Sequence, residues 1–460
     1  MSNERPTNNT APNDTAPNNT APNNHKQLPI DSDSFDSLAT RGLRLGLVDT
    51  DSAEFSLWLQ AEARGFHSPR LSDETIADQV RVLADRRTTG VWDESAADAA
   101  SPIASVSSWP TELTVPGHAS VTSWAISAVT VAPTHRRRGI ARALLEAELR
   151  TAHALGVPVA MLTVSEATIY GRYGFGPAAM GADWTIDTRR AKWTGPAASG
   201  RVQFVTLDQA VAAGVELNER VRLDTPGEIG FSGFLWERKL GIHVDDKTQA
   251  KQLRYVRYDD ADGVAQGLAI YRVVEIPEGG FTHTLDLQYL VTATDDAYAG
   301  LWRYLLEIDL VVEVTASLRS VEEPISWQVS DYRAARKKDE RDHLWTRILD
   351  LPTALEARRY GVPGRFLLEV ADPLGFAQDR VLMTINATGS ALVVPFDGAV
   401  PDDAAALSLS INELSALYLG GISAVLLARA GRITELTPDA ASAVDLSFRS
   451  AVTPRLSIWF

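Results

Sequence analysis

The pattern of hydrophobic and polar positions is weakest at the start of the chain. Residues 1–30 contain almost nothing to bury, and they repeat Thr-Ala-Pro-Asn-Asn, or a near copy, from Thr10, Thr15 and Thr20. Burial in such a segment releases too little free energy to offset the loss of chain entropy. We therefore predict that residues 1–37 form a disordered tail.

Regular patterns begin near residue 38 and predict a first domain over residues 38–186. Alternating strands and amphipathic helices are expected in it over 43–48, 53–66, 73–83, 88–92, 104–109, 121–131, 139–149 and 159–164. The helix that begins near Arg138-Gly139 places Ile140 and Leu144 on one apolar face. Phe66, at the end of the first helix, is expected to be a buried core aromatic, and the alternative is that it lines a pocket.

Two further domains are expected after residue 186. Residues 187–325 form the second, and their pattern shows no obvious chemistry. Residues 326–460 form the third, in which a charged stretch precedes strands, a helix and a short final strand, over 333–342, 366–370, 381–385, 391–395, 411–419 and 456–460. Several strands with packed helices predict an α+β domain.

Composition excludes several classes of site and partner. The 460 residues include no Cys, which removes disulfides, thiol nucleophiles and thiolate metal sites. The eight His residues show no ligand spacing, so no metal site is predicted. No run reaches the ~18 apolar residues of a membrane span, and the N-terminus has no signal core, so we expect a cytoplasmic protein. The net charge of −15 disfavours nucleic acid and suits a cationic partner.

Three arginines, Arg136 to Arg138, lie at the N-terminus of the predicted helix. This is the unfavourable end for cations, because the first N–H groups of a helix already present partial positive charge. The arrangement is favourable if an anion lies between them. Backbone N–H groups and guanidinium groups would then hold a pyrophosphate, with Gly139 and Ala141 allowing close approach. The alternative is a solvated basic turn.

At these residues the chain resembles a known family. Arg136-x-x-Gly139-x-Ala141 after a strand resembles the coenzyme A pyrophosphate loop of the GCN5-related N-acetyltransferases (GNAT). A second strand, 159–164, precedes Tyr170-x-x-x-Gly174-Phe175, where that superfamily places its general acid. The amino-acid sequence of segments 132–139 and 169–177 is similar to that of the Eis (enhanced intracellular survival) N-acetyltransferases. The resemblance covers about everything after residue 40 and continues through 301–303, 344–348, 352–358 and 417–420.

The resemblance implies an α+β architecture: a catalytic GNAT domain, a degenerate GNAT-like domain and a sterol-carrier-protein-like domain. It implies acetyl-coenzyme A as cosubstrate and no metal. The residues that it places at the cofactor are Val129, Thr130, Val131, Arg137, Arg138, Gly139, Ile140, Ala141, Arg142, Ser165 and Glu166. From the residues alone, Ser165 would cap the short helix that follows and Glu166 would favour its N-terminus.

Acetyl transfer needs a proton donor for the leaving thiolate and a proton acceptor for the amine. Tyr170 suits the first role, because a phenol with a usual pKa of ~10 is protonated at neutral pH and can donate its proton; a structural Tyr is the alternative. For the second role Glu166 is a candidate by position, whereas the resemblance indicates the free carboxylate of Phe460. That carboxylate needs burial or an ordered water to act near neutral pH. It must then reach the first domain, with Ile458 and Trp459 buried there.

The second domain contains a segment that aligns with the arginine loop. Residues 290–306 laid on 129–145 place Gly300 on Gly139 and Arg303 on Arg142, whereas Asp295-Asp296 fall on the basic segment. An acidic loop would repel a pyrophosphate. We interpret the segment as a duplicated fold that has lost cofactor binding; chance similarity of one strand–helix unit is the alternative.

The expected function is acetyl-coenzyme A-dependent N-acetylation of primary amines on polycationic small molecules such as aminoglycosides. The alternatives are acetylation of protein lysines and a non-catalytic acyl-coenzyme A or lipid-binding scaffold. The resemblance also implies a homo-oligomer, typically a hexamer.

Overall fold

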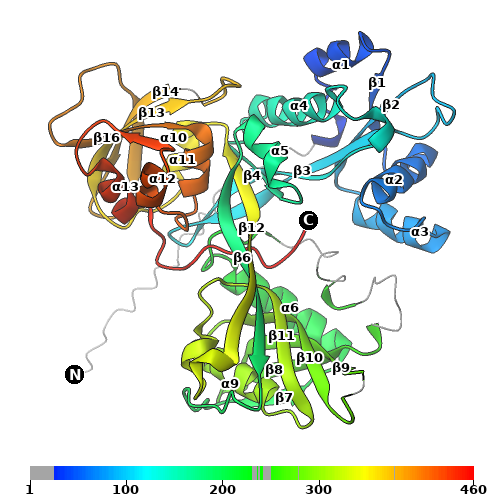
Figure 1. Ribbon diagram of the computed structural model, residues 1–460, viewed down its shortest axis with the longest axis vertical. Coiled ribbons are helices and arrows are strands. Elements are labelled where there is room, and N and C mark those ends of the chain that lie inside the picture. The colour runs from blue at the N-terminus through cyan, green and yellow to red at the C-terminus, as the bar shows by residue number, and fades with distance from the viewer. Residues whose placement is uncertain (1–24, 231–235, 237–238, 242–249, 278, 378) are drawn as a thin grey trace, which may run out of the picture.

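A computed structural model describes residues 25–230, 236, 239–241, 250–277, 279–377 and 379–460. One twelve-stranded sheet, in the order β1-β2-β3-β4-β5-β12-β6-β11-β10-β9-β8-β7, joins the first and second domains. A separate five-stranded sheet lies in the third domain. Figure 1 shows three lobes arranged around the long strands β6 (Gly176–Asp187) and β12 (Ala335–Ile348). The predicted α+β architecture is confirmed.

The first domain follows the predicted pattern closely. Its strands are β1 (Arg44–Val48), β2 (Arg87–Trp92), β3 (Ala104–Val115), β4 (Ala119–Val131) and β5 (Val159–Thr163). Its helices include α2 (Ala53–Gly65), α3 (Asp73–Val82) and α4 (Ile140–Ala154). Helix α4 buries Ile140, Leu144, Leu145 and Leu149 in the core, as its spacing predicts. β4 and β5 are parallel and the other neighbours, β1 to β4, are antiparallel.

The predicted disordered tail does not extend over residues 25–37. These residues include η1 (His25–Gln27) and most of α1 (Ser32–Ala39), whereas residues 1–24 lie outside the described residues. The buried Arg87 donates to the carbonyls of Leu28 at 2.6 Å and Pro29 at 3.1 Å. Arg150 of α4 pairs with Asp31 at 2.7 Å. The prediction was wrong here because these contacts come from residues distant in sequence.

The second domain repeats the first around one strand–helix–strand unit. Its elements are β7 (Arg201–Phe204), α6 (Leu207–Arg222), β8 (Arg254–Asp259), β9 (Ala265–Glu275), β10 (His283–Thr292), α9 (Asp295–Leu306) and β11 (Val311–Arg319). β10 and β11 are parallel and flank α9 in the chain, as β4 and β5 flank α4. The predicted order of strand, turn and helix over 290–306 is confirmed.

The third domain has the sheet order β15-β14-β13-β16-β17. Its elements are α10 (Leu351–Glu356), β13 (Gly364–Ala371), β14 (Asp379–Ile385), β15 (Ala391–Pro395), β16 (Ala404–Ser410), α11 (Ile411–Leu417), α12 (Ala424–Arg429), β17 (Ile433–Glu435) and α13 (Ala440–Phe448). The charged stretch 333–342 falls largely in β12, which pairs with β5 and β6 in the large sheet. The change of sheet therefore follows Ile348 rather than residue 326.

The last residues return from the third domain to the first. In Figure 1 the red C-terminal segment crosses β6 and β12 and ends between the first and second lobes. The predicted strand at 456–460 does not form. Side chains hold this segment instead: His343 Nε2 lies 2.8 Å from the Ile458 carbonyl, and the Ser457 N–H donates to Glu228 at 3.2 Å.

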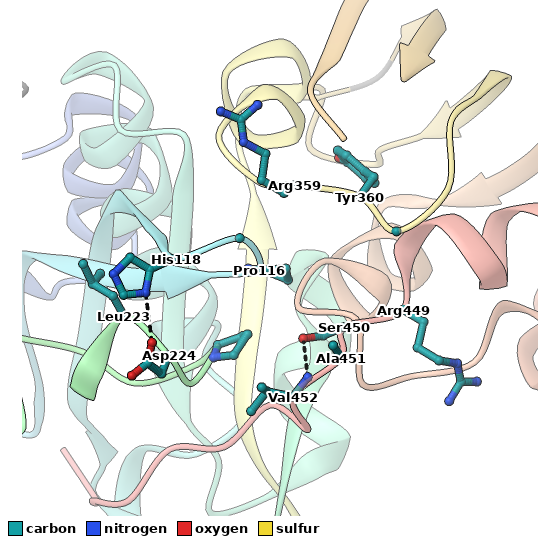
Figure 2. Close-up of a pocket in the computed structure, with 13 residues that line it drawn as sticks. Pro116, His118, Leu223, Asp224, Arg359, Tyr360, Arg449, Ser450, Ala451 and Val452 are labelled. Carbon is teal, nitrogen blue, oxygen red and sulfur yellow. Dashed lines mark hydrogen bonds and ion pairs between the residues drawn. The ribbon is translucent and has the colours of Figure 1, made fainter. Parts of the chain in front are cut away.

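The three domains meet at a hollow of about 280 Å³ (Figure 2). The β3–β4 turn contributes His118, which pairs with Asp224 of the second domain at 2.9 Å. Arg359 and Arg449 of the third domain point away from that pair in Figure 2. Their charges do not converge on the hollow, so it lacks the arrangement of a charged-ligand site. In the described part of the chain, no helix has the length and apolarity of a membrane span.

Candidate active site

The two central strands of the first domain separate where a cofactor arm would lie. β4 pairs with β5 only over Ser123–Ala125 and Val159–Met161, so Val129, Thr130 and Val131 lie beyond the pairing. A bulge at this point gives Ala128 a φ of +55°, and the Ser105 hydroxyl donates to the Ala128 carbonyl at 2.8 Å. Backbone groups of 129–131 on the β5 side are therefore available for the amides of a pantetheine arm.

The arginine loop follows directly after β4. Arg137 and Gly139 adopt positive φ values of 64° and 72°, and Gly139 is the N-cap of α4. Arg136 and Arg137 are exposed, whereas Arg138 lies 3.3 Å from Asp93. The loop therefore presents guanidinium groups beside the free N–H groups of a helix terminus, which is the geometry of an anion site.

Asp93 fixes one side of this loop. Hydrogen bonds from Ser95, His135 and Arg138 hold the pKa of the Asp93 carboxyl well below its usual range. Its side chain is only 11% exposed, and His135 Nε2 lies 3.2 Å from it. Arg138 is therefore oriented by the protein and partly neutralised, and Arg137 is the more available of the two predicted phosphate ligands.

Sequence reasoning missed Arg41, which also lies at this loop. Arg41 donates to the Arg138 carbonyl, and Arg138 donates to the Arg41 carbonyl at 3.3 Å. A Cβ atom at position 139 would clash with the Arg41 guanidinium. Gly139 is therefore favoured by its positive φ, and a side chain there would also displace the flexible end of Arg41. The Arg41 position has no recognisable motif in the sequence, and only the fold brings it to the loop.

The other predicted cofactor residues on α4 differ in placement. The Ile140 side chain is buried in the core, Ala141 is half-buried, and Arg142 is exposed and pairs with Glu146 at 2.6 Å. Their contribution to an anion at the helix terminus therefore comes from backbone N–H groups. Arg142 points its charge along the helix toward Glu146.

Tyr170 ends the short helix α5 (Ala167–Tyr170) and is 6% exposed. Burial raises the pKa of its phenol, and a hydrogen bond with Ser165 opposes that shift. The N-cap of α5 is Glu166 and it makes no side-chain cap hydrogen bond, so the predicted Ser165 cap is wrong. Ser165 and Glu166 are both exposed. Because Ser165 contacts the phenol, it is better placed to orient Tyr170.

A buried ion pair supports the loop that carries Tyr170. Arg347 of β12 donates to the Tyr173 carbonyl at 2.8 Å and to both carboxylate oxygens of Asp372 at 2.7 Å. Both side chains of the ion pair are fully buried. The third domain is thereby tied to the segment that follows β5.

The chain end reaches the same strand. A carboxylate oxygen of Phe460 accepts a hydrogen bond from the Thr163 hydroxyl at 2.8 Å, at the last residue of β5. Ile458 is 2% exposed, as expected, but Trp459 is 44% exposed, so its predicted burial is wrong. The Trp459 ring packs edge-on to His343 at 4.4 Å on one side only. The Phe460 oxygen that accepts this bond therefore lies where β4 and β5 separate.

A cleft of about 330 Å³ lies beside this carboxylate. It is formed by α2, α3, β3, the bulge of β4 and the chain end. Its aromatic and charged lining residues are Trp58, Glu62, Phe66, Arg86, Trp459 and Phe460. Phe66 is 47% exposed, so its expected place in the core is wrong. The alternative position, in the lining of a pocket, is the one that the structure shows.

Comparison with known proteins agrees with this geometry. Acetyltransferase (GNAT) domain families match residues 49–178 and 232–350, and the sterol carrier protein domain family matches 351–457. The N-acetyltransferase Eis of Mycobacterium tuberculosis is 32% identical over 356 residues, which are 76% of this chain and 83% of that protein. The chain belongs to the Eis family of N-acetyltransferases.

Two further proteins are similar along most of the chain. An uncharacterized N-acetyltransferase of Streptomyces avermitilis is 36% identical over 416 residues, 87% of this chain and 95% of that protein. The crystal structure of Eis1 from Mycobacterium abscessus has a TM-score of 0.75 at 26% identity and covers 91% of this chain and all of that one. The predicted tandem GNAT folds and the sterol-carrier-protein-like domain are confirmed, as is membership of an acetyltransferase family.

Among the described residues, no group of three His, Asp or Glu side chains could hold a metal ion. The fold brings 129–131, the arginine loop, Tyr170 and Phe460 around the ends of β4 and β5. Glu166, in contrast, is exposed beyond the end of β5. GNAT domains use acyl-coenzyme A donors, and the strand separation and arginine loop of this Eis-type chain fit such a molecule.

Proposed function

We propose that the protein transfers the acetyl group of acetyl-coenzyme A to a primary amine. Arg137, Arg41 and the N–H groups at the start of α4 would bind the phosphates. The backbone of 129–131 would bind the pantetheine arm. The observation that carries the proposal is the meeting, at the ends of β4 and β5, of an anion loop, a buried phenol and a free carboxylate.

The reaction needs two proton transfers, one to the Phe460 carboxylate and one from the Tyr170 phenol. The amine nitrogen forms a bond to the thioester carbonyl carbon, and the carbon–sulfur bond breaks. The Phe460 carboxylate takes the proton that the amine loses, and the Tyr170 phenol gives a proton to the leaving thiolate. The raised pKa of Tyr170 keeps the phenol protonated at neutral pH, so its proton is available to the thiolate as the carbon–sulfur bond breaks.

The setting of the Phe460 carboxylate supports its role as base. It accepts a hydrogen bond from the Thr163 hydroxyl, and the Phe460 ring lies edge-on to Trp109 with ring centroids 5.4 Å apart. The Arg86 guanidinium stacks on Trp109 at 3.7 Å. The carboxylate thus lies in a partly apolar setting with one hydrogen bond, where it retains oxygen lone pairs for an amine or an ordered water.

The cationic acceptor class is supported by the net charge of −15 and by Glu62 in the cleft. Polycationic acceptors, cytoplasmic location, a hexamer and the domain limits 38–186, 187–325 and 326–460 stay predictions. Sedimentation would test the hexamer, and the number of acetyl groups added to an aminoglycoside would test the acceptor.

The proposal is tested by following thiol release from acetyl-coenzyme A with a panel of amines. The panel includes a monoamine, a polyamine, an aminoglycoside and a lysine peptide. Amine-dependent release with an acetylated product supports the proposal. Tight acyl-coenzyme A binding without release for any amine would instead identify a scaffold.

A further inference from the structure

The acceptor cleft contains more exposed aromatic surface than an ammonium group alone requires. Phe66 at the end of α2 is 47% exposed and Trp459 at the chain end is 44% exposed, and both line the cleft. They come from opposite ends of the sequence, and Phe460 adds a third ring beside them. Large exposed aromatic surfaces that converge on a cavity indicate a ligand that covers them.

The charges of the cleft are few and nearly balanced. Among the described lining residues, the negative groups are Glu62 and the terminal carboxylate, and the positive group is Arg86. If the terminal carboxylate acts as the base, it cannot serve as a permanent counter-ion for a second ammonium group. Arg86 would also repel a second cation, because like charges in a partly desolvated site interact strongly.

The position of Trp459 makes this balance specific to the chain end. The carbonyl of the preceding residue, Ile458, is within hydrogen-bond distance of His343. The Trp459 ring packs against the same histidine, with ring centroids 4.4 Å apart. A carboxylate at position 459 would place a second negative charge directly beside the base. The tryptophan contributes an aromatic side chain to the same cleft instead.

From these observations we propose that the preferred acceptor is a monocationic arylalkylamine, a primary amine on a short chain that carries a planar apolar ring. The inference rests on the proposed function and narrows its acceptor class. The ring would lie against Phe66 and Trp459, and the amine would face the Phe460 carboxylate. A cavity of about 330 Å³ lies near the lower end of small-molecule sites, which are roughly 300–1,000 Å³, and suits one ring system with a short arm.

The test compares kcat/KM for 2-phenylethylamine, butylamine, spermidine and kanamycin with the full-length protein. We expect 2-phenylethylamine to exceed both butylamine and spermidine by about tenfold or more. Trp459→Glu should narrow the ratio of phenylethylamine to spermidine by about tenfold, by adding a counter-ion and removing the ring. Trp459→Phe, which keeps an aromatic ring, should retain the wild-type ratio.

Calorimetric titration with the same amines provides a readout that does not depend on turnover. The inference is overturned if spermidine or kanamycin is the better wild-type substrate, or if Trp459→Glu leaves the ratio unchanged. Either result leaves acetyl transfer itself intact. If no amine is acetylated, the proposed function fails, and calorimetric preference for the arylalkylamine then decides whether the cleft assignment survives.

Discussion

Conversion of the Phe460 carboxylate to a carboxamide tests the base with almost no change in shape. The carboxamide can be introduced by ligation of a synthetic C-terminal peptide. It retains an oxygen that can accept from Thr163, which now lies 2.8 Å from the carboxylate. It has no basic lone pair for the ammonium proton.

The structure sets the size of the effect. Hydrogen bonds to charged groups contribute about 1.5–3 kcal/mol and neutral ones about 0.5–1.5 kcal/mol, so the change weakens the Thr163 contact by about 1 kcal/mol. Loosening of the chain end by that amount accounts for about a fivefold loss of rate. The His343 contact to Ile458 and the burial of Ile458 remain. Loss of a general base lowers turnover by roughly 10²–10⁴.

The assay is the initial rate of thiol release at saturating acetyl-coenzyme A with the best amine of the panel. We expect kcat to fall at least a hundredfold while the melting temperature and cofactor affinity stay close to wild type. An N-terminal extension before Met1 is the control and should have no effect. Turnover within fivefold of wild type for the carboxamide would refute the assignment of the base.

Three further predictions concern the acid, the phosphate loop and the anchor of the chain end. Tyr170→Phe should lower kcat by roughly 10²–10⁴ with cofactor binding retained, whereas Tyr173→Phe in the same motif should not; equal rates would move the proton donor elsewhere. Arg41→Ala should raise the KM for acetyl-coenzyme A about tenfold or more. It should leave unchanged the KM for an acetyl-pantetheine donor, which has no nucleotide. The control variant Arg44→Ala, nearby on β1, should change neither KM. Burial lowers the pKa of His343 from its usual ~6.5 to about 4 in the folded protein. Between these two pH values the unfolded chain binds a proton at this histidine more readily than the folded one. The folded protein therefore has its full stability above about pH 6.5 and loses stability as the pH falls toward 4. Between pH 7 and pH 5 this loss is about 2 kcal/mol, and His343→Asn should flatten it in melting experiments at the two pH values; an unchanged slope would contradict the reasoning.

The local elements of the first domain were predictable because their signals are local. The apolar spacing of Ile140 and Leu144 determines the buried face of α4, and Gly139 marks where that helix begins. The loop of three arginines and the position of Tyr170 are likewise continuous stretches of chain. Patterns of this kind depend on backbone geometry over a few residues, which the sequence specifies directly.

The sequence alone also predicted the duplicated strand–helix unit around Gly300, whereas the role expected of the chain end came from the family resemblance and stays a prediction. Tertiary structure decided which side chains meet. Arg41 reaches the arginine loop and Trp459 stays exposed in the cleft, although neither belongs to a motif that predicts this. Of the two positions considered for Phe66, the structure shows the one in the cleft lining. Such contacts join residues from separate elements, and burial depends on what the rest of the chain packs against them. The carboxylate of Phe460 meets Thr163 across 297 positions because β12 and the third domain return the chain to β5, a path that no local pattern encodes.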